Sequence, residues 1–477
     1  MRRFPSGKVL RFGGVEATSE VQESMKVLVV GGGGREHALA WKLARSPLAS
    51  EVITAPGNAG TQLAGRNADV AASDLDGLVR LAVGESVGLV VVGPEAPLCA
   101  GLGERLRSKG IPVFGPDADG ARLEGSKVFA KELLDRHRIP TAAWRRFDRA
   151  GAAKSYLETI TVWPQVIKAD GLAGGKGVFV VDDGREACSV VDSVMEERAL
   201  GDAGSEVVIE EFVKGRELSV HAITDGSTIL ILEPSMDHKQ VGEGDTGPNT
   251  GGMGIYSPVA FATARLMRQV EQRVLLPTLH ALQVEGVEYR GVLYAGLMIT
   301  EAGPRVLEFN CRFGDPEMQG IVRRMPGDLL PILLAAAEGR LAEVDPPAWD
   351  PRTCVGVVGT AEGYPGSYRK GDVITGLDAS ASVEEAVVFH AGTRQDGRSV
   401  LTDGGRVLCV TALGDGMAAA RERAYRAFDE LSWSGKSCRR DIGLPRPGHE
   451  IGDAAEPLEG GVVTGRGVHP GGRRPGP

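Results

Sequence analysis

A buried strand that runs through a glycine turn into an amphipathic helix begins at Met25, with the sequence MKVLVVGGGGREHALAWKLA. Further strand-like segments lie at residues 52–55, 89–92 and 112–114, and helical stretches separate them. Parallel strands need crossover connections, and these connections are usually helices. The alternation therefore predicts a parallel sheet covered by helices over residues 25–125.

The character of the chain changes twice after this segment. Residues 126–345 mix helical and strand-like stretches with several glycine-rich loops, which predicts an α+β arrangement. Residues 346–445 contain short strand-like segments before the helical stretch GMAAARERAYRAFDEL, so we expect a small β-rich domain there. Residues 1–24 form an N-terminal extension without the apolar core of a signal peptide, and residues 446–477 are rich in Gly, Pro and Arg. We expect both ends to be disordered.

The charge and cysteine content exclude several classes of protein. Lysine and arginine number 54 against 63 acidic residues, and the net charge of −9 argues against a general nucleic-acid or membrane-surface binder. No apolar run in the sequence approaches the roughly 18 residues that a membrane-spanning helix needs. The six cysteines are scattered without a CxxC pair, so we expect neither a disulfide framework nor a zinc site, and a reducing, cytoplasmic compartment.

The run EFNCRFGDPE (residues 308–317) follows two strand-like segments joined by a turn. Residues two apart on a strand share a face, so Glu308, Asn310 and Arg312 are predicted to project together. Carboxylate and amide oxygens suit Mg²⁺, which is usually held by one or two protein groups plus substrate phosphates, and Arg grips phosphate bidentately. A strand with a polar solvent face is the alternative, but Asp315 in the adjoining turn favours a nucleotide-phosphate metal site.

The glycine turn GGGGREHAL (residues 31–39) lies between a strand and a helix, where backbone amides and the helix N-terminus favour an anion. The dinucleotide fingerprint fails here, because His37 stands where the third glycine belongs and no acid follows the second strand. A phosphate on another kind of ligand fits better. The remaining alternative is a turn that serves only tight packing.

A second glycine loop, KADGLAGGKGVFVV (residues 168–181), lies between two strand-like segments and is bracketed by Lys168 and Lys176. Glycines let backbone amides approach phosphate oxygens, and lysines add point charges. The spacing GxxxGK, followed by glycine, is not a Walker A loop. Lys127, in the segment EGSK, is a candidate third cation over the phosphates.

Two further segments are candidates for ligand contacts. In VVIEEFVKGRELSV the backbone around Glu211 and Val213 is placed to bond an adenine edge, and Glu217 to accept from ribose hydroxyls. The loop DHKQVGEGDTGPNTGGMGIYSP (residues 237–258) is long and glycine-dense. Loops of this length inside compact domains are usually functional or disordered.

Taken together, these segments resemble the phosphoribosylamine–glycine ligase (glycinamide ribonucleotide synthetase) family of the ATP-grasp superfamily. The matching segments, in family order over about residues 25–443, include MKVLVVGGGGREHALAWKLA, APGNAGT, VVGPEAPL, LEGSK, KADGLAGGKGV, EEF, DHK, GDTGPNTGGMG, LYAGLM, EFNCRFGDPE, VFHAGT, GGRVL and CRRDIG. The resemblance implies a Rossmann-like substrate (pre-ATP-grasp) domain over 25–125, an ATP-grasp domain over 126–345 with a mobile lid at about 145–212, and a C-terminal domain over 346–445.

The resemblance also implies a reaction. ATP would phosphorylate the carboxylate of glycine to give glycyl phosphate, and the amine of 5-phosphoribosylamine would displace phosphate to form glycinamide ribonucleotide, the second step of de novo purine synthesis. The implied partners are these small molecules, with no nucleic acid and no membrane, and a monomer is expected.

Roles for individual residues follow from the same resemblance. Mg²⁺ or Mn²⁺ would be held by Glu308 and Asn310, and Arg312 and Asp315 would be catalytic. The implied ATP-binding residues are Lys127, Lys168, Gly174, Gly175, Lys176, Glu210, Glu211, Val213 and Glu217. The implied substrate-binding residues are Gly33, Gly34, Arg35, Glu95, Lys239 and Gly252.

The sequence departs from the family pattern at three places. Gln240 stands where the family usually has Arg, Gly174 stands where Ala is commoner, and Leu444-Pro445 begins an unrelated tail. Two alternatives stay open at this stage: another ATP-grasp ligase or carboxylase, and a nucleotide-binding protein without catalysis. Neither explains why the segments GPNTGGMG and CRFGDPE occur together with the groups that the chemistry needs.

Overall fold

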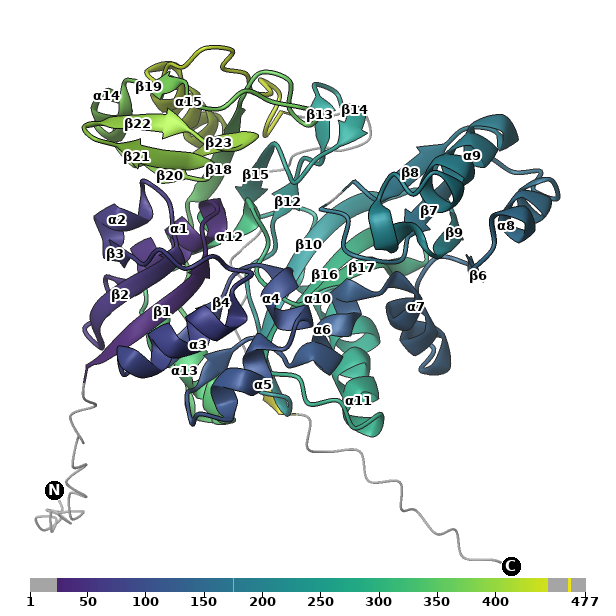
Figure 1. Ribbon diagram of the computed structural model, residues 1–477, viewed down its shortest axis with the longest axis horizontal. Coiled ribbons are helices and arrows are strands. Elements are labelled where there is room, and N and C mark those ends of the chain that lie inside the picture. The colour runs from purple at the N-terminus through teal and green to yellow at the C-terminus, as the bar shows by residue number, and fades with distance from the viewer. Residues whose placement is uncertain (1–23, 175, 445–461, 465–477) are drawn as a thin grey trace, which may run out of the picture.

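The computed structural model describes residues 24–174, 176–444 and 462–464 (Figure 1). In this view the N-terminal part lies at the lower left, a small subdomain projects to the right, and the C-terminal part lies at the top. The predicted fold class, a parallel-sheet domain followed by mixed α/β parts and a β-rich C-terminal part, is confirmed. Within the described ranges, no helix has the length and apolar character to cross a bilayer.

The N-terminal part is a five-stranded parallel sheet in the order β3-β2-β1-β4-β5. Its central strand β1 and neighbouring β4 are almost wholly buried, which is why they read as continuous apolar runs. The strands are β1 (Met25–Gly31), β2 (Ala49–Pro56), β3 (Arg66–Asn67), β4 (Leu89–Val92) and β5 (Val113–Phe114). The helices are α1 (Gly34–Leu43), α2 (Thr61–Ala64), α3 (Leu75–Gly84), α4 (Glu95–Cys99) and α5 (Leu102–Arg107).

The middle of the molecule is a second, antiparallel sheet in the order β17-β16-β10-β11, with β24 at its edge. Its long strands are β10 (Arg216–Thr224), β11 (Thr228–Ile231), β16 (Gly291–Thr300) and β17 (Gly303–Asn310). Helices that surround it include α6 (Ala118–Gly125), α7 (Lys127–Arg136), α10 (Ala264–Val270), α11 (Leu276–Val284), α12 (Glu317–Arg324) and α13 (Leu330–Glu338). Apolar side chains of β10, β16 and β17 join the largest hydrophobic core.

The small subdomain on the right of Figure 1 is a four-stranded antiparallel sheet in the order β6-β9-β7-β8. Its strands are β6 (Trp144–Phe147), β7 (Gln165–Ala169), β8 (Val178–Val181) and β9 (Val207–Glu211), with helices α8 (Ala150–Leu157) and α9 (Gly184–Val191). It has a hydrophobic cluster of its own, separate from the two larger cores. A separate core lets a subdomain move as a unit, since few apolar contacts tie it to the rest.

The C-terminal part shares a sheet with the middle of the chain. That sheet has the order β12-β15-β18-β23-β20, and its first two strands come from the long glycine-rich loop region. The strands are β12 (Met236–Asp237), β15 (Gly254–Ser257), β18 (Thr353–Thr360), β20 (Ala386–His390) and β23 (Arg406–Gly414). Helix α15 (Met417–Asp429) packs on β18 and β23, and β19 (Val373–Ile374), β22 (Ser399–Thr402) and β21 (Thr393–Asp396) form a small separate sheet.

The expectation of a disordered tail over residues 446–477 is wrong at one point. Strand β24 (Val462–Thr464) pairs antiparallel with β11, with Thr228 opposite Thr464. Strand β11 would otherwise be the edge of the middle sheet, and an edge strand offers unpaired backbone groups to any extended segment. Residues 1–23, Gly175, and the tail on both sides of β24 lie outside the described residues.

Candidate active site

Both residues of the predicted metal-type pair lie on strand β17. Glu308 and Asn310, two residues apart, lie opposite Gly296 and Tyr294 of β16. A side chain at Gly296 would come within 3.3 Å of the Glu308 Cγ atom, so the glycine leaves space for the carboxylate. Lys239 reaches the same place, with its Nζ 3.3 Å from Glu308 Oε1. Lys239 was predicted to bind substrate, and in the structure its ammonium group forms an ion pair with the Glu308 carboxylate.

Three lysines set the charge of Glu308. Burial favours a raised pKa for this carboxyl group, but the positive charges of Lys239, Lys127 and Lys168 outweigh burial and lower the pKa to about 2. In return, Glu308 and Glu217 raise the pKa of Lys239 well above its usual value, although burial opposes them. The site therefore holds an ionised carboxylate among ammonium groups, which suits a polyanionic ligand with a bound cation.

Lys127 is held by the start of helix α7. Ser126 caps this helix by accepting from the Phe129 amide at 3.0 Å, and Asp170 of the second glycine loop accepts from the Val128 amide at 2.7 Å. Asp170 also accepts from the Ser126 hydroxyl at 3.0 Å. This arrangement ties the glycine loop after β7 to the helix end that carries Lys127, and a helix N-terminus itself favours phosphate.

Lys168 lies on β7 and is buried. Its Nζ is 2.9 Å from Glu210 Oε1 and donates to the Leu307 carbonyl at 2.8 Å. That carbonyl is available because the pairing of β16 with β17 skips Leu307. Glu210 is also bonded to Lys131, at 2.8 Å. The predicted adenine-side carboxylate Glu210 therefore faces two lysines inside the protein, and Lys131 is a charged neighbour that the sequence analysis missed.

The segment predicted to contact adenine and ribose is more exposed. Glu211 at the end of β9 pairs with Arg305 at 2.8 Å and accepts from the Ala143 amide at 3.0 Å. Val213 lies in the connection between β9 and β10. Glu217 on β10 is 3.8 Å from Lys239, so its carboxylate faces the same lysine as Glu308. Of these residues, Glu217 is the one that the structure places beside a lysine of the Glu308 site.

The second glycine loop adjoins a cavity of about 590 Å³. Lys176, strand β8, Gln240 and the turn at Asn249 line it, together with Pro365 from the C-terminal part. Gly174 has a left-handed backbone (φ 57°), and a side chain there would meet nothing within 4 Å. The predicted residue Gly175 lies outside the described residues.

The prediction that Arg312 continues the polar strand face is wrong, because β17 ends at Asn310. Arg312 instead donates to Glu124 at 2.7 Å, to Glu95 at 3.3 Å and to the Phe313 carbonyl at 3.3 Å. Burial favours a lowered pKa, but these two carboxylates raise the pKa of Arg312 overall. Glu95, predicted to bind substrate, is thus a partner of Arg312.

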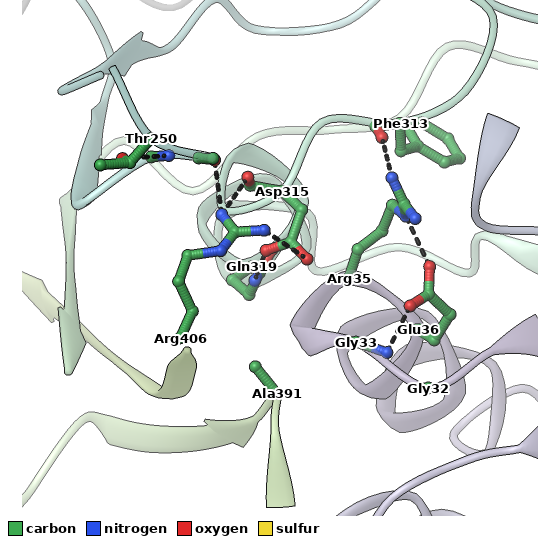
Figure 2. A network of polar contacts seen from close by, with 12 residues as sticks. Gly32, Gly33, Arg35, Glu36, Thr250, Phe313, Asp315, Gln319, Ala391 and Arg406 are labelled. Atoms are coloured by element: carbon green, nitrogen blue, oxygen red, sulfur yellow. Dashed lines mark hydrogen bonds and ion pairs between the residues drawn. The ribbon is translucent and has the colours of Figure 1, made fainter. Parts of the chain in front are cut away.

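A second group of predicted residues meets where the first glycine turn approaches the loop after β17 (Figure 2). Asp315 accepts from the Gln319 amide at 2.7 Å, and its Oδ2 is 3.3 Å from Arg406 Nη2. A side chain at Gly33 would come within 3.2 Å of Asp315 Oδ2, and one at Gly34 within 2.6 Å of Gln319 Nε2. We call Gly33, Gly34, Asp315, Gln319 and Arg406 the glycine-turn cluster.

The donors of this turn are used within the protein. The Gly33 amide donates to Glu36 Oε2 at 2.6 Å, and Arg35 donates to Glu36 Oε1 at 2.5 Å and to the Phe313 carbonyl at 3.0 Å. The predicted anion site is therefore filled in part by the carboxylate of Glu36. An acceptor of the cluster remains available to a ligand, because Gln319 Oε1 is buried without a hydrogen-bond partner among the described residues.

The sequence analysis missed the residues that bring distant segments to this cluster. Arg406, on β23, donates to the carbonyls of Asp315 and Gly251. Burial favours a lowered pKa for Arg406, but the charge of Asp315 outweighs burial and raises the pKa. Asn58 donates to the Gly32 carbonyl at 2.9 Å and to the His390 carbonyl at 2.9 Å. Both belong to segments quoted for the family resemblance, GGRVL and APGNAGT, but no local pattern reveals a partner so far along the chain.

Predicted substrate residue Gly252 lies beside the cluster. Its backbone is left-handed (φ 111°), and a side chain there would come within 2.7 Å of Asp237 Oδ1 and would overlap Pro316. Only glycine fits this conformation without strain. Burial and the nearby Glu317 raise the pKa of Asp237 well above its usual range.

The donor set fits a hard cation that is completed by its substrate. Glu308 and Asn310 offer oxygen ligands, as Mg²⁺ and Mn²⁺ prefer. In the described part of the chain, no group of three or more His, Cys, Asp or Glu side chains is placed to hold a metal ion. Two protein ligands suffice only where phosphate oxygens and water supply the others.

A small sheet that carries lysines against the carboxylate of a larger sheet is the arrangement of ATP-grasp ligases, and the structure places the chain in that class. The phosphoribosylglycinamide synthetase models match it in three consecutive parts: the N domain at residues 25–124, the ATP-grasp (A) domain at 125–318 and the C domain at 354–445. The chain belongs to the phosphoribosylglycinamide synthetase family.

Curated relatives agree with this membership. The phosphoribosylamine–glycine ligases of Escherichia coli K12 and Allochromatium vinosum are 50% and 51% identical, over 423 and 422 residues, and each alignment covers 88% of this chain and 98% of the relative. The solved structure of the Thermotoga maritima phosphoribosylamine–glycine ligase superposes with a TM-score of 0.75 at 34% identity, covering 87% of this chain and 100% of that one. A biotin carboxylase domain from Hydrogenobacter thermophilus shares the fold at 17% identity, with a TM-score of 0.65.

Proposed function

We propose that this chain joins glycine to 5-phosphoribosylamine at the expense of ATP, by way of glycyl phosphate, and releases glycinamide ribonucleotide, ADP and phosphate. A carboxylate accepts an amine only after one of its oxygens has become a good leaving group. Catalysis is then mainly charge neutralisation and alignment. The observation that carries the proposal is Glu308, ionised among Lys127, Lys168 and Lys239.

The phosphates of ATP would lie against these lysines. Lys127 stands at the first turn of α7, and Lys168 is fixed by Glu210 and by the Leu307 carbonyl. Glu308 and Asn310 would hold Mg²⁺ or Mn²⁺, and the bound ion would neutralise charge on the phosphate oxygens. Glu211, Val213 and Glu217 would border the adenosine end, and Lys176 with Gly174 would cover the phosphates and exclude water from the acyl phosphate.

Phosphoribosylamine would bind at the glycine-turn cluster. Asp315 and Gln319 supply acceptors for its amine and hydroxyl groups, and the bare backbone of Gly33 and Gly34 leaves room for close approach. Asp315 is ionised for this role, because Arg406 and Arg35 outweigh burial and lower its pKa. Arg312 donates to Glu95, Glu124 and the Phe313 carbonyl, so we assign it to holding the loop that carries Asp315.

The decisive experiment is an ADP-release assay with the purified chain. Glycine, phosphoribosylamine generated in situ and Mg²⁺ are each left out in turn, and the product is identified by mass spectrometry. We expect release to require all three and to yield glycinamide ribonucleotide. Release that depended on bicarbonate instead of glycine would indicate an ATP-grasp carboxylase, and binding of ATP without any turnover would indicate a protein that has lost catalysis.

A further inference from the structure

A buried line of charges joins helix α7 to two strands of the small subdomain. Lys131 Nζ on α7 lies 2.8 Å from Glu210 Oε2 on β9, and Lys168 Nζ on β7 lies 2.9 Å from Glu210 Oε1. The side chains of Lys131, Glu210 and Lys168 are 4%, 2% and 6% exposed. Buried ion pairs of this kind cost desolvation energy, so they are rarely kept for stability alone.

Lys131 makes only internal contacts. Besides Glu210, it donates to the Thr141 hydroxyl at 2.8 Å, and Thr141 donates in turn to the Val306 carbonyl at 2.7 Å. Its side chain is therefore shielded from any ligand. It nevertheless lies four residues after Lys127, one helical turn further along α7. The first of these lysines faces the phosphate side, and the second faces the carboxylate behind it.

The charges in this line do not cancel. Two lysines and one carboxylate leave one net positive charge, because Glu210 can offset only one of the ammonium groups. Lys168 donates one N–H to the Leu307 carbonyl and lies within ion-pair distance of Glu210 Oε1, so its ammonium group keeps N–H groups for another acceptor. Without Lys131, Glu210 would neutralise Lys168, and this line would add no net charge to the charges of Lys127 and Lys239.

We propose that Lys131 is a positioning residue of the nucleotide site, which pairs with Glu210 so that the charge of Lys168 stays available to the phosphates of ATP. This inference rests on the proposed function, since it assumes that ATP phosphates lie beside Lys168. It assigns no contact with substrate to Lys131. The pairing also joins α7 to β9 and β7, so it fixes the positions of Lys127 and Lys168 relative to each other.

The protonation of Lys131 makes the idea testable by pH. The charged groups that face it are Glu210 on β9, Lys168 on β7 and Asp135 on its own helix. Burial lowers the pKa of Lys131 to about 8, although Glu210 opposes this shift. As the pH rises through about 8, Lys131 loses its proton, and the line formed by Lys131, Glu210 and Lys168 loses its net positive charge. The KM for ATP should therefore rise on the alkaline side.

The test compares Lys131→Met and Lys131→Arg with the full-length wild type. We expect Lys131→Met to raise the KM for ATP about tenfold at pH 7.5 and to change kcat by less than about twofold. A remote charge affects binding of the ground state and of the transition state alike. The KM for glycine should not change. Lys131→Arg keeps a permanent charge, so it should restore the KM for ATP and abolish its rise between about pH 7.5 and 9.

Lys154→Met is the matched control, since Lys154 on α8 forms surface ion pairs with Asp192 and Glu196, away from the phosphate residues. It should leave both KM values and the pH profile unchanged. A KM for ATP in Lys131→Met equal to that of the control, or an alkaline rise that persists in Lys131→Arg, would overturn the inference. If Lys131→Met does not fold, the pH profile of Lys131→Arg decides alone. Failure of the proposed function would show differently, as absence of ligation by the wild type.

Discussion

At the scale of single residues, Glu308 concentrates the chemistry. It is the carboxylate on which Lys239, Lys127 and Lys168 all act, and Asn310, two residues further along β17, is the second oxygen ligand that we propose. Strand periodicity predicted both residues on one face, because side chains two residues apart on a strand point to the same side of the sheet. The surrounding lysines come from helix α7, strand β7 and the connection that follows β12, and only the fold brings them there.

Glu308→Gln should abolish ligation while leaving metal-free binding of ATP intact. The substitution keeps the shape but removes the charge that would hold the cation, and the lysines that we propose to contact phosphate remain. We expect kcat to fall by at least about a hundredfold, as for other groups that stabilise developing charge. Steady-state ligation and calorimetric titration with ATP in the absence of Mg²⁺ measure the two effects. Normal turnover by this variant would contradict the metal assignment.

Lys239→Met should destabilise the protein at neutral pH by about 1–2 kcal/mol, since one pKa unit corresponds to about 1.4 kcal/mol. The pKa of Glu308 in the folded state is about 2, below its usual value of 4.5, so its contribution is present above about pH 4.5 and is lost as the pH falls towards 2. Removing Lys239 raises that pKa. The deficit of the variant should therefore shrink between pH 5 and pH 3.

Urea unfolding at several pH values measures this deficit. Lys370→Met is the control, because Lys370 forms an exposed pair with Asp403 at 3.3 Å. Such a pair contributes about 0–1 kcal/mol. A deficit of Lys239→Met that stays constant with pH would show that Lys239 does not set the charge of Glu308.

At the scale of elements, the sequence predicted where strands lie better than where they end. The polar pattern of β17 suggested that Arg312 continues its face, but the strand stops at Asn310 and Arg312 turns to Glu124 and Glu95. The pattern also gave no sign that the ladder skips Leu307, whose carbonyl holds Lys168. Lys131, by contrast, could have been predicted from the sequence, because it lies four residues after Lys127 and so on the same face of a helix.

Gly174→Ala should slow closure of the glycine loop without blocking it. The space around a new Cβ is free, but the backbone at Gly174 has φ 57°, where alanine costs about 1 kcal/mol relative to glycine. Gly151→Ala is the matched control in helix α8, where a Cβ also meets nothing within 4 Å and alanine should stabilise by about 0.5–1 kcal/mol. Thermal unfolding and limited proteolysis of the loop should separate the two. Equal effects would mean that the loop does not hold this left-handed turn.

At the scale of the whole molecule, the parts are joined more closely than the sequence suggested. Strands β12 and β15 belong to the long glycine-rich loop, yet they extend the sheet of the C-terminal part. Arg406 and His390 likewise reach the glycine-turn cluster and Asn58 from the far end of the chain. Such contacts depend on tertiary packing, so periodicity and local motifs could predict the class of fold and propose phosphate-side residues, but they could not predict this interface.

The buried guanidinium of Arg439 connects the C-terminal segment to the hairpin that follows Lys239, formed by β13 (Gln240–Gly242) and β14 (Thr246–Asn249). It lies 2.8 Å from Asp245 and 2.6 Å from Asp441, and it donates to the Gln240 carbonyl at 3.0 Å. This contact uses the backbone of Gln240, so it does not depend on which side chain stands at that position. Burial favours a raised pKa for Asp441, but Arg439 and the Gly244 amide lower the pKa to about 2.

Arg439→Met should therefore cost about 3–5 kcal/mol, because it leaves two partly buried carboxylates without their cation. Arg440→Met is the neighbouring control: Arg440 pairs with Asp429 at 2.7 Å on the surface, and its loss should cost less than about 1 kcal/mol. Chemical unfolding measures both, and hydrogen exchange should show faster opening of the hairpin amides in Arg439→Met alone. If the two variants were equally stable, the C-terminal segment would not be what holds the hairpin, and Lys239 would owe its position to β12 and β15 instead.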